Sequence, residues 1–282
     1  MAHRAALRRI GTGVALAVPA LTLLPLVSAA ILVSPHAVFI DARSRSAVVN
    51  LVNTGTEAEE VTIDLRYGYP VTDSAGQISV RLFPLDSIPE GEPAATTWIR
   101  AFPARVIVRG GDRQVVRLLA QPPPGLPDGE YWTRMIVTSR GTQLHVAGGD
   151  SSVRAGVSLI VSTVISVTYR TGTLRTAAQL TDFRVEATRD SLIAWVGLQR
   201  DGNAAYLGTT WIRVRDAAGR VVREWDTPTA VYFSLHRRFV FALDSLAPGR
   251  YTAELELTTR RDDGVPSLAA EPIVRTVGVD VP

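Results

Sequence analysis

Apolar and polar residues alternate along most of this chain, and this period of two leaves few folds open. The alternation is clear at Val61, Ile63 and Leu65 and continues from Ile31 almost to the C-terminus. Turn-forming pairs such as Asp201-Gly202 recur between the alternating stretches. Successive side chains on a β-strand point to opposite faces, whereas an amphipathic helix needs apolar residues every three or four positions. The sequence therefore predicts an all-β fold made of sandwiches.

The composition excludes several classes of chemistry. The 282-residue chain contains no cysteine and no lysine, so its 30 basic side chains are all arginines. Without cysteine there is no disulfide framework, thiolate nucleophile or cysteine metal ligand. Without lysine there is no Walker-type phosphate loop and no Schiff-base chemistry. Three arginines lie in the acid-free first thirty residues, which leaves 27 arginines against 27 acids. A nucleic-acid partner is therefore not expected.

The N-terminus has the parts of a secretory signal peptide. Three arginines precede an apolar run from Ile10 to Val27, and the run ends in Val27-Ser28-Ala29. Small residues at the first and third positions before a cut suit signal peptidase. We expect residues 1–29 to be removed after Ala29 and the mature protein to be exported. An uncleaved membrane-spanning helix is the alternative, although two prolines interrupt a run that would need about 20 apolar residues.

One local pattern occurs twice. Residues 126–131 and 246–251 both read L-x-x-G-x-Y ahead of an alternating strand. This pattern is typical of a tyrosine corner, in which the ring packs in the core of an immunoglobulin-like sandwich and the hydroxyl bonds back to the backbone. We therefore expect two tandem immunoglobulin-like β-sandwich domains, at residues 30–170 and 174–282, joined between Tyr169 and Leu174. Chance repetition of a short pattern is the alternative.

Three stretches of the first predicted domain form an ordered set. The first leads from Ser34-Pro35-His36 into Val49–Gly55, and the second runs from Pro103 to Leu118. The third joins residues 126–131 to a long strand that ends in Tyr169-Arg170. In order and spacing the set resembles the PapD-like periplasmic chaperones of the chaperone–usher pilus pathway. The match covers residues 31–170, and the chain beyond residue 174 carries no motif of that family.

This resemblance implies a chaperone that is not an enzyme and that has no cofactor and no small-molecule substrate. Such chaperones stabilise pilus subunits, which are sandwiches without their last strand, by lending them an edge strand. Here the resemblance places the lending strand at Gly156–Ile165 and implies a pilin-like subunit and an outer-membrane usher as partners. The donated side chains would be Val157, Leu159 and Val161, with Ile165 nearer the cleft between the domains. An ordinary central strand, apolar on both faces, is the alternative.

Two further features of that family are altered here. The family holds the terminal carboxylate of its subunit between two basic side chains, and the matching positions are His36 and Ser166. An imidazole that is mostly neutral at pH 7 and a hydroxyl do not form a fixed positive clamp, so His36 either binds through its N–H or is an ordinary strand residue. Arg170 matches an arginine at the family's domain junction, and Asp263 is the nearest match for its acidic partner. A solvated turn is the alternative for Asp263.

Other chemistry has less support. Residues Gly148–Ser151 resemble a serine-protease nucleophile loop, but no glycine follows the serine and a flexible loop is preferred. Metalloprotease, calcium-loop and α/β-hydrolase motifs do not occur. Five tryptophans could form a carbohydrate platform, although their apolar neighbours favour core packing; they are Trp98, Trp132, Trp195, Trp211 and Trp225. A structural or adhesive β-sandwich protein of the cell envelope is the alternative to the chaperone.

Overall fold

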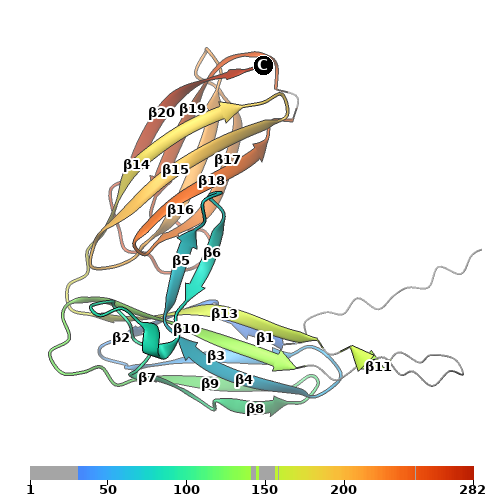
Figure 1. The fold of residues 1–282 in the computed structure, drawn as a ribbon, viewed down its shortest axis with the longest axis vertical. Coiled ribbons are helices and arrows are strands. Elements are labelled where there is room, and N and C mark those ends of the chain that lie inside the picture. The colour runs from blue at the N-terminus through green and yellow to red at the C-terminus, as the bar shows by residue number, and fades with distance from the viewer. Residues whose placement is uncertain (1–30, 141–143, 146–155, 158, 245) are drawn as a thin grey trace, which may run out of the picture.

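A computed structural model describes residues 31–140, 144–145, 156–157, 159–244 and 246–282. The expected signal peptide and the Gly148–Ser151 loop lie outside the described residues. Within these ranges the chain is almost wholly β-structure, with one short 3-10 turn, η1 (Leu85–Ser87). No helix there has the length and hydrophobicity of a membrane span. The all-β prediction is confirmed, with two sandwiches whose strands run in clearly different directions (Figure 1).

Two sheets form the first sandwich. One has the order β1-β3-β9-β7, with strands β1 (Ile31–Ser34), β3 (Ser46–Asn53), β9 (Arg113–Ala120) and β7 (Ile99–Phe102). The other has the order β2-β13-β10-β4-β8, with strands β2 (Ala37–Asp41), β13 (Ile160–Thr171), β10 (Gly129–Arg140), β4 (Glu59–Arg66) and β8 (Arg105–Val108). Alternate side chains of both sheets, among them Leu51, Val61 and Met135, are fully buried between them. The two-residue strands β11 (Leu144–His145) and β12 (Gly156–Val157) pair separately.

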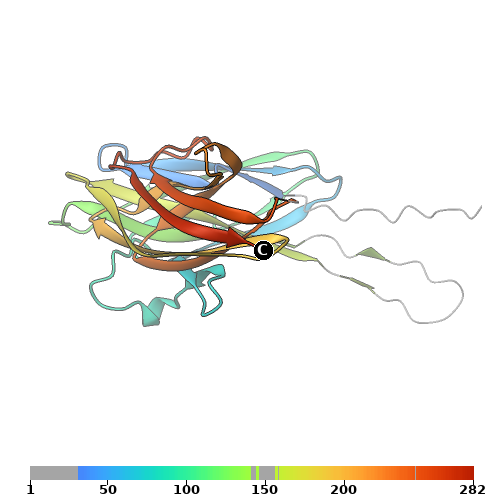
Figure 2. The ribbon, with the colours of Figure 1, turned by 90° about the horizontal axis from the view of Figure 1, so that it is seen from above.

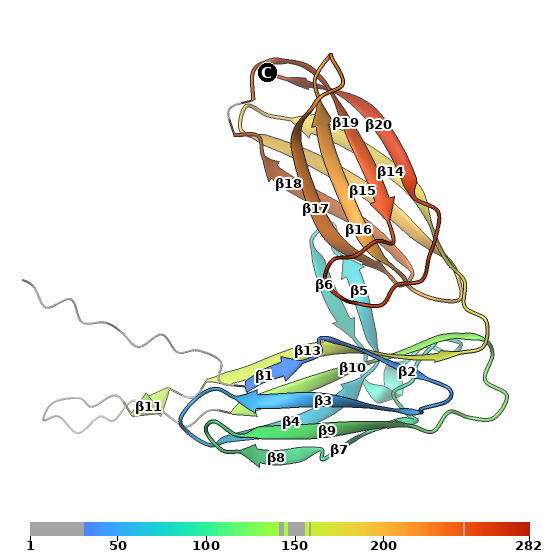
Figure 3. The same ribbon diagram turned by 180° about the vertical axis from the view of Figure 1, so that it is seen from behind.

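The N-terminal segment of this sandwich changes sheets. Its first part, β1, pairs antiparallel with β3 in one sheet, and its second part, β2, pairs parallel with β13 in the other. Only five residues of β2 therefore remain to cover the side of β13. Figure 3 shows β1 and β2 crossing between the two layers from behind.

The second sandwich also has two sheets. One has the order β14-β15-β18, with strands β14 (Thr176–Ala187), β15 (Ser191–Gly202) and β18 (Ser234–Ala242). The other has the order β17-β16-β19-β20, with strands β17 (Val221–Val231), β16 (Tyr206–Arg215), β19 (Gly249–Thr258) and β20 (Ile273–Val281). Leu192, Ile212 and Leu255 belong to the buried core between the sheets. The chain passes from the first sandwich to the second between Thr171 and Thr176.

Both predicted tyrosine corners are present. The hydroxyl of Tyr131 donates to the carbonyl of Pro127 at 2.9 Å, and that of Tyr251 donates to the carbonyl of Ala247 at 2.8 Å. The rings pack against the first and the second core, respectively. The repeated L-x-x-G-x-Y pattern therefore marks the same corner in each sandwich.

A hairpin of β5 (Gly68–Thr72) and β6 (Ile78–Leu82) stands between the sandwiches and pairs with neither set of sheets (Figures 1 and 2). The N–H of Arg238 in β18 donates to the carbonyl of Gly76 at the hairpin tip, 3.0 Å away. Gly76 has a φ of +74°, and a Cβ there would lie 2.6 Å from the Cβ of Arg238. The tip therefore needs a glycine both for its conformation and for its close approach to β18.

Aromatic side chains of the hairpin and of both sandwiches pack against one another. The rings of Tyr69 and Phe233 lie edge to face at 4.6 Å, and those of Trp132 and Tyr232 at 4.7 Å. These contacts form a third buried cluster, separate from the two sandwich cores. The junction of the two domains thus has a hydrophobic core of its own.

Candidate functional site

One side of β13 is only partly covered. The strand pairs with β10 along its whole length, from Ile160 opposite Arg140 to Thr171 opposite Gly129. On its other side, β2 pairs only with Ser166–Arg170. Among the described residues, no strand covers that side from Ile160 to Ile165. The first half of β13 is therefore a free sheet edge, and the second half is an interior strand.

The backbone of this edge has a defined orientation. The N–H of Ser166 donates to the carbonyl of His36, 3.2 Å away, and so points away from β10. Backbone groups of alternate residues point to the same side of a strand. The N–H and C=O groups of Ile160, Ser162 and Val164 therefore face the open side. Such a row is a template for pairing with another strand.

The side chains along the edge are mostly apolar. Leu159 is 42% exposed and Val161 is half-buried on one face, while Ile160 and Val164 are exposed on the other. Whether Val157 belongs to the expected row is not tested by the described residues. Gly156 and Val157 belong to β12, separate from β13, and the side chain of Val157 lies outside the described residues.

Ile165 is a correction to the expected donated face. Its side chain is 1% exposed because it packs in the core of the first sandwich together with Val167. A side chain buried in its own domain has no area left for a partner. The available apolar side chains on that face are therefore Leu159 and Val161.

The two positions that match the family's carboxylate anchor lie side by side. Ser166 bonds to the backbone of His36, and it pairs with Ala37 in the parallel register. The side chain of His36 is exposed, and that of Ser166 is half-buried. The fold thus brings these residues together at the end of the free edge, but neither side chain carries a fixed positive charge.

The sequence interpretation missed an arginine on the strand next to Ser166. Arg134 in β10 is directly opposite Ser166 and is 6% exposed. Its Nε donates to the carbonyl of Gly68 at 2.9 Å, and its guanidinium carbon lies 4.8 Å from the ring centroid of Tyr232. Its Nη2 has no hydrogen-bond acceptor among the described residues. Arg134 therefore carries a fixed positive charge with an unused donor on the strand next to Ser166, and its guanidinium is directed toward Gly68 and Tyr232.

Arg170 forms an ion pair at the domain junction, but its acidic partner is not the expected Asp263. Arg170 donates to Glu130, its neighbour in β10, with Nε and Oε1 2.8 Å apart. Asp263 instead pairs with Arg261 in its own exposed turn. The carboxylate of Glu130 also accepts a hydrogen bond from the backbone N–H of Ala205 in the second sandwich, at 2.9 Å. Arg170 thus reaches the second domain through Glu130, which sequence comparison alone could not reveal.

The tryptophans divide into two groups. Trp98, Trp132 and Trp225 pack against the buried clusters, as the core interpretation expects. Trp195 and Trp211 are half-buried on the outer faces of the second sandwich, because the buried residues of their strands occupy the alternate positions. The prediction of core packing is therefore wrong for Trp195 and Trp211.

No protein-family model and no curated protein sequence matches this chain. Comparison with solved structures finds the YadV chaperone at 14% identity and a TM-score of 0.46, covering 88% of this chain and 99% of that one. It also finds the CsuC–CsuE chaperone–tip adhesion subunit complex of Acinetobacter baumannii, at 13% identity and a TM-score of 0.40, over 89% and 98% of the two chains. The Pseudomonas aeruginosa CupB2 chaperone matches at 13% identity and a TM-score of 0.40, and the match covers 87% of this chain and 98% of that one. Each of these three solved structures is described as a chaperone or as a complex that contains one.

Proposed function

We propose that this protein is a periplasmic chaperone that lends the free edge of β13 to a pilin-like subunit lacking a strand. The observation that carries the proposal is the half-covered state of β13, which is paired along one side and open on the other from Ile160 to Ile165. Natural proteins normally cover, shorten or charge such edges to prevent unwanted pairing. This edge carries no charged side chain between Leu159 and Ile165. An edge left open and apolar is suited to receiving a strand of a partner.

Backbone pairing would supply much of the affinity. Three residues, Ile160, Ser162 and Val164, offer two outward groups each. Six hydrogen bonds at about 0.5–1.5 kcal/mol apiece would contribute roughly 3–9 kcal/mol before ordering costs. Burial of the exposed 42% of Leu159 would add only about 0.6–1.3 kcal/mol. The partner is therefore expected to pair along the edge, with apolar side chains selecting its register.

Arg134 is the proposed contact for a carboxylate at the end of the captured strand. Its Nη2 is buried without an acceptor, and hydrogen bonds from guanidinium to carboxylate are among the stronger ones in proteins. Arg134 would then take the place of the basic pair that His36 and Ser166 do not provide.

Aspartate substitution of Leu159 tests the proposal. Leu159→Asp should fold normally, since the side chain is 42% exposed, but its charge would be buried unpaired in a complex at a cost of several kcal/mol. Leu119→Asp is the matched control, because Leu119 in β9 is 47% exposed on the outer face of the other sheet. The measurement is co-purification of pilin-like subunits encoded beside this gene.

We expect wild type and Leu119→Asp to retain the subunit and Leu159→Asp to lose it. Retention by Leu159→Asp would remove the strand from the mechanism. Failure of the wild-type protein to retain any such subunit would favour the structural or adhesive envelope protein instead.

A further inference from the structure

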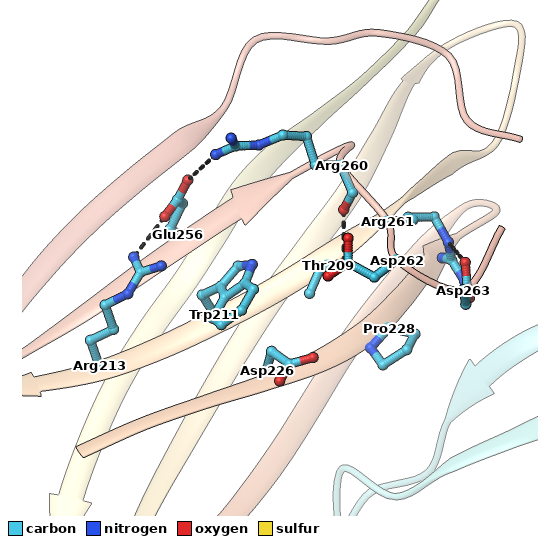
Figure 4. A pocket seen from close by; sticks show the side chains of 10 residues that line it. All are labelled: Thr209, Trp211, Arg213, Asp226, Pro228, Glu256, Arg260, Arg261, Asp262 and Asp263. Carbon is cyan, nitrogen blue, oxygen red and sulfur yellow. Dashed lines mark hydrogen bonds and ion pairs between the residues drawn. The ribbon is translucent and has the colours of Figure 1, made fainter. Parts of the chain in front are cut away.

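A pocket on the second sandwich, remote from β13, has no part in strand lending. It has a volume of about 490 Å³, within the range of small-molecule sites. Its floor is the outer face of β16, and one wall is the turn at Arg260–Asp263 (Figure 4). The half-buried indole of Trp211 lies near its centre, between Glu256 and Asp226.

The sheet register sets the spacing of these three side chains. Trp211 is directly opposite Asp226 in β17 on one side and Glu256 in β19 on the other. Adjacent strands lie about 4.8 Å apart, so the two carboxylates flank the indole across roughly 10 Å. A flat ligand resting on the indole would therefore meet a carboxylate at each edge.

Several polar groups in the pocket are unused. Among the described residues, neither the carboxylates of Asp226 and Asp262 nor the indole N–H of Trp211 has a hydrogen-bond partner. The side chain of Arg260 is 86% exposed, and its guanidinium is paired only loosely with Glu256, at 3.7 Å. The pocket thus offers free acceptors and free donors around one aromatic ring. Donors and acceptors mixed in this way suit hydroxyl groups, which both give and accept hydrogen bonds.

The pocket is held in shape before any ligand arrives. Arg213 is bound by Glu224, Glu254 and Glu256, and its guanidinium carbon lies 5.2 Å from the indole centroid. In the wall, the side chain of Arg261 is only 10% exposed and donates to the carbonyl of Gly208 at 3.1 Å. A preorganised site loses less conformational freedom on binding.

The charges argue against an ionic ligand. Four carboxylates and three guanidinium groups line the pocket, so an anion would be repelled by the acids and a cation would find Arg213 already beside the indole. We propose that this pocket binds a neutral saccharide, with one sugar ring stacked on Trp211 and its hydroxyls bonded to Asp226, Glu256 and Arg260. The pocket would give the second domain a glycan-binding role independent of strand lending.

Titration calorimetry of the mature chain with maltotriose, cellotriose and triacetylchitotriose tests this inference. At least one trisaccharide should bind in the millimolar range or tighter, and Trp211→Ala should weaken it by about tenfold or more. Trp195→Ala is the matched control, because Trp195 is also half-buried on an outer face of this domain and lies in the other sheet. It should bind like wild type.

Three results would overturn the saccharide site. They are no binding of any trisaccharide up to about 10 mM, equal binding by Trp211→Ala, and Trp211-dependent binding of a tri-arginine peptide in place of the sugars. The last result would make the pocket a cation site. Asp226→Asn, which keeps the shape of the side chain, should weaken a bound sugar by a smaller factor than Trp211→Ala. Because none of these measurements involves β13, their failure would leave the proposed chaperone function untouched.

Discussion

A proline substitution at Ser162 tests whether one side of β13 is uncovered while the other is paired with β10. Ser162 lies four residues before Ser166, whose N–H points toward β2, so the N–H of Ser162 points to the uncovered side as well. The ladder to β10 uses the neighbouring residues Val161 and Thr163. Proline has no N–H to donate, and edge strands tolerate it when the missing N–H faces solvent. Ser162→Pro should therefore remove one outward donor while the sandwich keeps its pairing.

The size of the effect follows from the bond that is lost. A complex would lose a hydrogen bond of about 0.5–1.5 kcal/mol and leave the partner's carbonyl unsatisfied at a further cost of about 1–3 kcal/mol. A total of about 1.5–4.5 kcal/mol corresponds to a roughly 13- to 2,000-fold weaker complex. Ser162→Ala controls for the loss of the exposed contact between Ser162 Oγ and Thr138 Oγ1, 3.0 Å long, and should capture normally.

Thr163→Pro is the matched substitution on the other side of the strand. Thr163 is directly opposite Val137, which is 2% exposed, and their backbones face each other. Proline at Thr163 would leave the Val137 carbonyl without its donor, at a cost of about 1–3 kcal/mol to folding. For a domain of this size, each kcal/mol lowers Tm by about 2–4 °C.

Thermal unfolding and subunit co-purification should be measured together for these variants. We expect Thr163→Pro to lose thermal stability and Ser162→Pro to lose capture with much less change in Tm. If Ser162→Pro unfolds as readily as Thr163→Pro, the side assigned as open is paired. Full capture by a stably folded Ser162→Pro protein would show that the edge is not lent.

Three further substitutions test the junction and the second sandwich. Glu130→Gln should weaken the bond to Arg170 by about 1.5–3 kcal/mol and lower the unfolding free energy in urea, because Glu130 is 1% exposed and its partner loses a charged acceptor. Arg134→Met should lower subunit affinity, since it removes the unpaired Nη2, and should also lower the unfolding free energy by about 1–3 kcal/mol, because the buried carbonyl of Gly68 loses its donor; unchanged affinity of the folded variant would exclude the carboxylate contact. Hydrogen bonds from Arg215 hold the pKa of Glu254 below its ordinary value of 4.5 despite burial, so its stabilising effect is complete above that pH and is lost as the pH falls through the lowered pKa. Urea unfolding between about pH 3 and 6 should show that the unfolding free energy falls less with decreasing pH for Glu254→Gln than for wild type.

The sequence was informative where its signals were local. Alternation predicted strands, and the L-x-x-G-x-Y pattern predicted corners that the bonds of Tyr131 and Tyr251 confirm. Both signals depend on residues a few positions apart, whose geometry follows from the backbone alone.

Features that depend on pairing between distant strands could not be predicted from the sequence. Arg134 is notable only because the register places it opposite Ser166, and Glu130 only because its carboxylate meets both Arg170 and Ala205. Trp211 has apolar neighbours in sequence, yet Ile212 takes the inward position and leaves the indole outside. Alternation gives two faces for each strand and does not say which one is buried. The position of the β5–β6 hairpin apart from both sandwiches likewise has no local signature.

The position of the β5–β6 hairpin in the chain also imposes an order on folding. The hydrogen bond from the N–H of His236 to Thr72 Oγ1 joins residues 164 positions apart. Contacts of such separation form late, since the entropy of closing the loop must be overcome before they contribute. During synthesis the hairpin emerges before β18 exists, so the contacts between them cannot form until the second sandwich has been made. We therefore expect the contacts between the hairpin and β18 to form late in folding.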